Sequence, residues 1–179
     1  TAAHYNGKIP RNPFAMYHVD PDHKEREFLT LNELTAMTEI KLEDPNMAFA
    51  RDLFIFGSWT GIAFIDIKNL TEDNISMVNG APWIVSKRQK TGVPFQIKLL
   101  DIPMQIVERY KSFRNGNHLF NIGNLDSINK RIKKVAVMCG IKKRVSFHVS
   151  RHSWAVLALE YGMPIESVSK ILGHTNITT

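Results

Sequence analysis

The hydrophobic pattern of this chain changes its period twice. In the first and last thirds, apolar residues recur at the three- and four-residue spacing of helices. The middle instead holds short runs at 74–78, 83–88 and 95–99, separated by the turn-forming dipeptides Asn79-Gly80 and Thr91-Gly92. The pattern therefore predicts an α+β fold, mostly helical, with one small three-stranded antiparallel sheet.

Two helices carry clear start signals. Thr30 and Glu33 form a capping box, which predicts a helix that ends at about Lys41. Asp44 and Pro45 open the next helix, and its run to Trp59 is so densely apolar that we expect it at the centre of the core. Further helices are expected over 63–70, from 103 to about 114, and over 125–139, 148–161 and 164–172.

The charge is concentrated in one block. The 179 residues carry a net charge of +6, but residues 87–151 hold 15 basic and 3 acidic side chains, a net charge of +12. Residues 1–86 carry 7 basic and 12 acidic side chains, a net charge of −5. So basic a block favours a polyanionic partner such as a phosphate backbone.

Other features narrow the class of protein. The single cysteine, Cys139, excludes an internal disulfide and a four-cysteine metal site, as suits a reducing cytoplasm. No apolar run is long enough to span a membrane, so we expect a cytoplasmic protein without a membrane partner. Residues 1–27 hold three prolines and a mixed-charge run, which indicates a linker or arm.

His148 and Arg151 stand three residues apart in a predicted helix and therefore lie on one face. A guanidinium matches two phosphate oxygens in a plane, and an imidazole can move a proton at neutral pH. A second imidazole, His174, follows Gly173 near the end of the chain. These three side chains together are suited to bind an anionic phosphate.

These residues resemble the catalytic domain of the tyrosine recombinases, the phage-integrase family. The resemblance rests on the order and spacing of several segments along residues 28–179. They are Phe28-Leu29-Thr30 leading into Glu33-Leu34, Thr60-Gly61-Ile62 with Asp66, the hairpin turn Gln89-Lys90-Thr91-Gly92, His148-x-x-Arg151 and Leu172-Gly173-His174.

The resemblance implies site-specific DNA strand exchange without a metal or nucleotide cofactor. A tyrosine would attack the scissile phosphate and form a 3′-phosphotyrosyl link. Lys90 would be the general acid, His148 would assist proton transfer, Arg151 would stabilise the non-bridging oxygens and His174 would add a hydrogen bond. It implies double-stranded DNA as partner, a homo-tetramer on DNA, and a monomer for the isolated domain. Residues 1–27 would link it to a missing N-terminal DNA-binding domain.

Basic residues inside the +12 block are expected to contact DNA as well. They are Lys87, Arg88, Lys130, Lys134, Lys142, Lys143 and Arg144.

The sequence departs from the family pattern in two places. The family usually has an arginine where Ala63 stands, although some branches on mobile elements lack it. Arg51 is our candidate substitute, against the alternative of a salt bridge with Asp52 or Glu43. The nucleophilic tyrosine would come about nine residues after His174, beyond the final residue Thr179. We therefore expect a truncated, inactive fragment.

Two other interpretations remain open. His148 and His152 are four apart on a predicted helix, as in zinc metalloproteases, with His174 as a possible third ligand. Against zinc, Val149 replaces the glutamate base and cations crowd the segment. Alternatively, 162–179 resembles the helix-turn segment of a DNA-binding module without catalysis. That alternative leaves the grouping of Lys90, His148 and Arg151 as coincidence.

Overall fold

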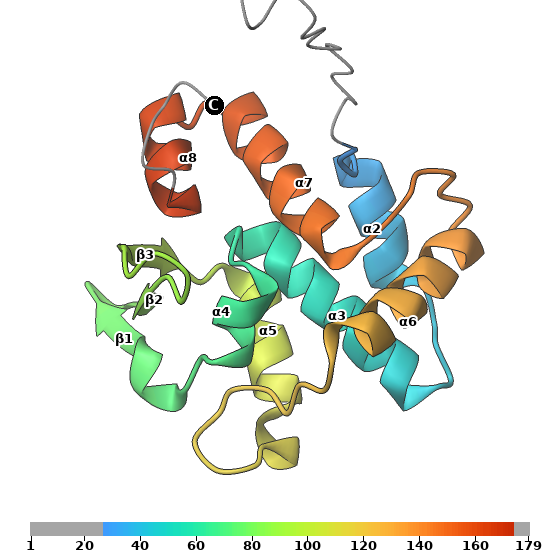
Figure 1. The fold of residues 1–179 in the computed structure, drawn as a ribbon, viewed down its shortest axis with the longest axis horizontal. Helices are drawn as coiled ribbons and strands as arrows, with labels where there is room; N and C mark the ends of the chain where they lie inside the picture. Colours follow the sequence, from blue (N-terminus) through green and yellow to red (C-terminus); the bar gives the residue numbers. More distant parts are fainter. Residues whose placement is uncertain (1–26, 174–179) are drawn as a thin grey trace, which may run out of the picture.

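A long buried helix, α3 (Pro45–Thr60), runs through the middle of the fold (Figure 1). The computed structural model describes residues 27–173. Phe54 and Phe56 of α3 are fully buried, Phe54 against the Phe147 ring and Phe56 against the Phe120 ring. Helices α2, α5, α6 and α7 pack around it. The prediction that this segment forms the centre of the core is confirmed.

The first two helices begin at the predicted caps. The Thr30 hydroxyl accepts from the backbone N–H of Glu33, and the Glu33 carboxylate accepts from the backbone N–H of Thr30, before α2 (Leu31–Glu39). Asp44 caps α3 by accepting from Asn46 N at 2.8 Å. The first helix ends two residues earlier than predicted, because Ile40 has already left the helical backbone region.

The predicted three-stranded sheet is present. Strands β1 (Ile75–Val78), β2 (Ala81–Lys87) and β3 (Pro94–Lys98) pair antiparallel in that order. Ile84 on β2 pairs with Ile97 on β3, and both side chains are buried. The strands differ from the predicted runs by at most two residues at each end.

The remaining helices follow the sheet, apart from α4 and one single-turn helix before it. They are α4 (Phe64–Lys68), α5 (Asp101–Arg109), α6 (Leu125–Met138), α7 (Phe147–Glu160) and α8 (Ile165–Leu172), with single-turn helices at Glu72–Asn74 and Lys111–Phe113. No helix within residues 27–173 is long and apolar enough to cross a membrane.

Three parts of the chain meet above one end of α3. The hairpin β2–β3 lies on one side, α7 crosses the core on the other, and α8 packs against both α7 and β3 (Figure 1). The end of α3 itself stays close to α7, because Gly61 takes a left-handed backbone conformation (φ 65°) directly beneath the Trp154 ring. This junction contains the candidate site.

Candidate active site

A pocket of about 420 Å³ opens where α4, the β2–β3 hairpin, α7 and the end of α8 meet. Lys90 was predicted from the hairpin turn and His148 and Arg151 from a helix far from it in sequence, and all three line this pocket. The structure adds Asp66, Arg88 and His152 to its polar lining. The fold therefore places three cations, two imidazoles and one carboxylate around one cavity.

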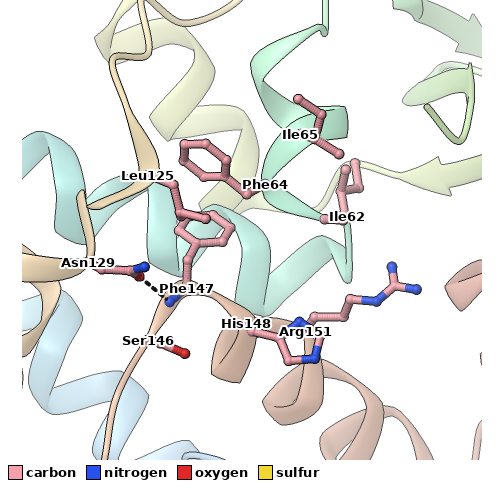
Figure 2. Close-up of a pocket in the computed structure, with 10 residues that line it drawn as sticks. Ile62, Phe64, Ile65, Leu125, Asn129, Ser146, Phe147, His148 and Arg151 are labelled. Carbon is pink, nitrogen blue, oxygen red and sulfur yellow. Dashed lines mark hydrogen bonds between the residues drawn. The ribbon is translucent and has the colours of Figure 1, made fainter. Parts of the chain in front are cut away.

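Helix α7 presents His148 and Arg151 to the pocket because its opposite face is buried. Phe147, Ser150 and Trp154 are all buried against the core. The helix start is fixed by Phe147 N, which donates to Asn129 Oδ1 at 2.7 Å. Figure 2 shows an adjoining pocket, with the guanidinium of Arg151 directed away from the Phe147 ring.

Arg151 is held by two backbone carbonyls. Its Nη1 donates to Gly61 O at 2.8 Å, and its Nη2 donates to Leu172 O. Burial and, to a smaller extent, the nearby charge of Arg88 lower the pKa of Arg151 to about 10, while Asp66 opposes the shift. The side chain is still a cation at neutral pH. Because its charge is disfavoured here, an anion in the pocket would stabilise it.

Arg88, which the sequence predicts to contact DNA, lies in the wall of the pocket. Its side chain is buried, with only 5% of its surface exposed. Its Nη1 donates to Asp66 Oδ2 at 2.9 Å, its Nη2 donates to Ile171 O, and its guanidinium carbon lies 4.2 Å from the centre of the Phe95 ring.

Asp66 connects that arginine to the hairpin turn. Its second carboxylate oxygen, Oδ1, accepts from Gln89 N at 2.8 Å, so one buried carboxylate holds both Arg88 and the backbone next to Lys90. The turn is closed by Gly92 N, which donates to Arg88 O at 2.8 Å. The exposed Lys90 side chain is thereby carried on an anchored loop.

Arg51, our candidate to replace the missing arginine, is bonded to the end of α2. Its Nη1 donates to the carbonyls of Met37, Thr38 and Ile40 at 3.0, 2.8 and 3.2 Å. Its Nε lies 2.5 Å from Asp52 Oδ1, which matches the alternative of a salt bridge, although a buried one. Arg51 thus caps the end of α2 and does not line the pocket.

One of the predicted DNA-binding lysines is also engaged within the fold. Lys143 Nζ donates to Phe28 O at 2.9 Å and to Glu33 Oε2 at 2.6 Å, and it lies 5.3 Å from the centre of the Phe28 ring. This lysine joins the loop before α7 to the start of α2. The other cations predicted to contact DNA are exposed: Lys87, Lys130, Lys134, Lys142 and Arg144.

The end of α8 approaches the pocket closely at Gly173. A Cβ at this position would lie 3.2 Å from Arg88 Cγ, and the residue has a left-handed backbone (φ 66°). The predicted site residue His174 lies outside the described residues. Within residues 27–173, no group of three or more His, Cys, Asp or Glu side chains is placed to hold a metal ion.

Comparisons with known proteins found a matching family, related sequences and solved structures of similar fold. Residues 27–179 match the Phage integrase family. The chain belongs to this family. A tyrosine recombinase of Pseudothermotoga lettingae is 44% identical over 48 residues, which cover 27% of this chain and 17% of the relative. Tyrosine recombinase XerC of Natranaerobius thermophilus is 26% identical over 173 residues, covering 87% of this chain and 58% of XerC.

Solved structures of similar fold include other integrases. The Tn1549 transposon integrase in complex with circular intermediate DNA has a TM-score of 0.71 at 19% identity, covering 99% of this chain and 67% of that one. A lambda integrase dimer bound to a core site has a TM-score of 0.72 at 18% identity, covering 99% and 68%. This phage-integrase chain spans about half the length of most of the curated relatives it matches. The mostly helical α+β class is confirmed.

Proposed function

We propose that this chain is the catalytic domain of a site-specific DNA recombinase, an integrase of a mobile element that cleaves and rejoins DNA strands. The observation that carries the proposal is the meeting of Arg88, Arg151, Lys90 and His148 around one pocket. Two guanidiniums offer paired donors to the oxygens of a phosphate, and an ammonium and an imidazole beside them can exchange protons with it.

In this proposal Arg88 takes the part of the arginine that Ala63 does not supply. Both residues line the same pocket, so a guanidinium reaches the cavity from the hairpin instead of from the segment after α3. Arg88 and Arg151 are close enough for the charge of one to lower the pKa of the other. A bound phosphodiester would relieve that repulsion, and the charge that develops in the transition state would relieve it further.

In the proposed reaction, each side chain either transfers a proton or stabilises negative charge. A tyrosine, expected after Thr179 in a longer chain, attacks the phosphorus and forms the 3′-phosphotyrosyl bond while the bond to the 5′-oxygen breaks. The proton of the tyrosine hydroxyl passes to His148, and Lys90 protonates the leaving 5′-oxygen. Arg88 and Arg151 stabilise the non-bridging oxygens, and His174 adds a hydrogen bond. No metal or nucleotide cofactor takes part.

The exposed cations support double-stranded DNA as the substrate. Lys130 follows Asn129, which lines the adjoining pocket, and Lys87 precedes Arg88 at the end of the hairpin strand. Both lysines therefore follow or precede a pocket-lining residue in the chain. Lys134, Lys142 and Arg144 extend the basic surface along α6 and the loop before α7. We propose a cytoplasmic enzyme that forms a homo-tetramer on DNA, with the isolated chain a monomer.

The test uses a longer chain that includes the segment after Thr179. Incubated with nicked duplexes from both ends of the surrounding element, it is expected to form a covalent protein–DNA adduct. Arg151→Ala should abolish the adduct while leaving most of the DNA affinity, because many other cations contribute to binding. Lys111→Ala, at an exposed lysine that does not line the pocket, is the matched control.

A modified substrate tests the acid separately. If Lys90 protonates the 5′-oxygen, Lys90→Ala should lose cleavage of ordinary DNA but recover it when sulfur replaces that oxygen, because a thiolate leaves without a proton. Salt-dependent DNA binding with no adduct from any substrate would instead favour the non-catalytic DNA-binding module.

A further inference from the structure

His152 is a pocket residue to which the proposed reaction gives no part. It lies one turn after His148 on α7, is half-buried and lines the same pocket. The two imidazole rings meet edge to face, with centroids 4.4 Å apart and an interplanar angle of 88°. Zinc does not account for this pair among the described residues, since no third ligand joins it there.

The charges around the two rings are mostly positive. Three cations and one carboxylate face them, and the residues contributed by the end of α8, Leu172 and Gly173, are uncharged. The charged groups are Arg88, Lys90, Arg151 and Asp66. The pocket therefore carries a net charge of about +2 before either imidazole is protonated. Two protons on the pair would add repulsion between the rings and with both guanidiniums, so the second proton is much harder to add than the first.

We propose that His152 is a positioning residue for His148: it fixes the ring edge-on and competes with it for one shared proton. This inference rests on the proposed phosphate-binding function. In the empty pocket the competition keeps His148 largely neutral, which is the form that can accept a proton. A phosphodiester adds negative charge, so its binding draws a further proton onto the pair.

A purely structural role for His152 predicts something different. An aromatic ring of similar size would then serve as well, and His148 would titrate as an isolated group. His152→Phe separates the two accounts, because it keeps a flat ring against His148 and removes the competing base. His118→Phe is the matched control, since His118 is exposed and pairs with Thr71 away from the pocket.

The experiment follows the imidazole C–H signals of this chain by NMR from about pH 5 to about pH 8.5. In the unaltered protein, the signals of His148 and His152 are each expected to titrate in two steps. In His152→Phe, His148 should titrate in one step, with its midpoint raised by roughly one pH unit. His118→Phe should leave both curves unchanged.

Two results would overturn the proposal. One is a single-step titration of each ring in the unaltered protein, and the other is an unchanged His148 midpoint in a folded His152→Phe variant. Circular dichroism checks the fold of each variant. If the phenylalanine variant does not fold, His152→Asn and the shape of the curves in the unaltered protein decide the question.

Dimethyl phosphate tests the coupling to phosphate, because this phosphodiester keeps one charge throughout the pH range. Its addition should raise the titration midpoints of both rings, and the size of that rise should fall in His152→Phe. No response of either ring would contradict the proposed function itself. A response combined with independent single-step titrations would contradict only the role of His152.

Discussion

Asp66 and Arg88 form a buried ion pair, with 2.9 Å between Oδ2 and Nη1 and side chains that are 4% and 5% exposed. The same carboxylate accepts from Gln89 N, so this one contact joins α4 to the hairpin turn that carries Lys90. Since Arg88 also donates to Ile171 O, the pair links three segments that the chain keeps far apart.

Asp66→Ala is expected to lower the free energy of unfolding by about 3 kcal/mol or more, because it leaves a buried guanidinium without its counter-charge. Urea denaturation measures the change. Asp73→Ala is the control, since Asp73 is exposed and its change should stay within about 0.5 kcal/mol. Equal effects of the two substitutions would show that the buried pair does not stabilise the fold.

Substitutions at Arg51 and Arg88 should affect different properties, stability for Arg51 and cleavage for Arg88. Arg51→Met removes the cap of α2 and leaves Asp52 with one cationic partner fewer, so the free energy of unfolding should fall by about 3 kcal/mol. Its cleavage rate per folded molecule should be unchanged in the longer chain. Arg88→Lys keeps a cation beside Asp66 but loses the planar fork, and cleavage should fall about 100-fold or more. If a folded Arg51→Met variant lost cleavage, Arg51 would have a role in catalysis.

Gly61 and Gly80 provide a matched pair of substitutions. Both have left-handed backbones, with φ of 65° and 75°, so alanine at either position should cost about 1–2 kcal/mol from the backbone alone. A Cβ at Gly61 would lie 2.6 Å from Trp154 Cδ2, whereas a Cβ at Gly80 has open space. Gly61→Ala should therefore cost an additional 1–3 kcal/mol or so, measured as the difference in urea unfolding. If the two variants lose the same stability, the end of α3 can move away from α7.

Glu33 should make stability depend on pH in the acid range. Burial by itself raises the pKa of Glu33, but hydrogen bonds from Lys143 and Thr30 outweigh it and bring the pKa below its ordinary value of 4.5. A lowered carboxyl pKa contributes stability that is present above pH 4.5 and is lost as the pH falls through the folded-state value.

Glu33→Gln should therefore cost about 1 kcal/mol at pH 7 and almost nothing in strong acid, where both proteins are uncharged at this position. Urea unfolding at a series of pH values measures the difference. Glu39→Gln, at the exposed end of the same helix, controls for the loss of one carboxylate charge. A stability difference that is constant with pH would mean that the Lys143 contact contributes nothing.

Much of this fold could be predicted because its signals are local. The capping box at Thr30, the hairpin dipeptide Asn79-Gly80 and the dense apolar run of α3 each act over a few neighbouring residues. Their elements therefore appear within about two residues of the predicted bounds. The grouping of Lys90, His148 and Arg151 was also expected, but from resemblance to a family and not from periodicity.

The contacts that the sequence did not predict involve charged residues whose partners are distant in sequence. Nothing local distinguishes Arg51, Arg88 and Lys143 from solvent-exposed cations in a basic chain. Arg51 is buried because the carbonyls at the end of α2 lie beside α3, and Lys143 is engaged because the start of α2 lies beside the loop before α7. These contacts join residues that are far apart in sequence, so the short-range spacing of residues cannot predict them.

The sequence by itself determined the order of helices and strands, the family pattern and the surplus of cations, because each depends on residue type and short spacing. Only the tertiary structure decided which cation enters the pocket. Arg88 enters because the β2–β3 pairing turns its side chain inward, toward a carboxylate 22 residues earlier in the chain. That arginine and Ala63 line the same pocket from different segments of the chain.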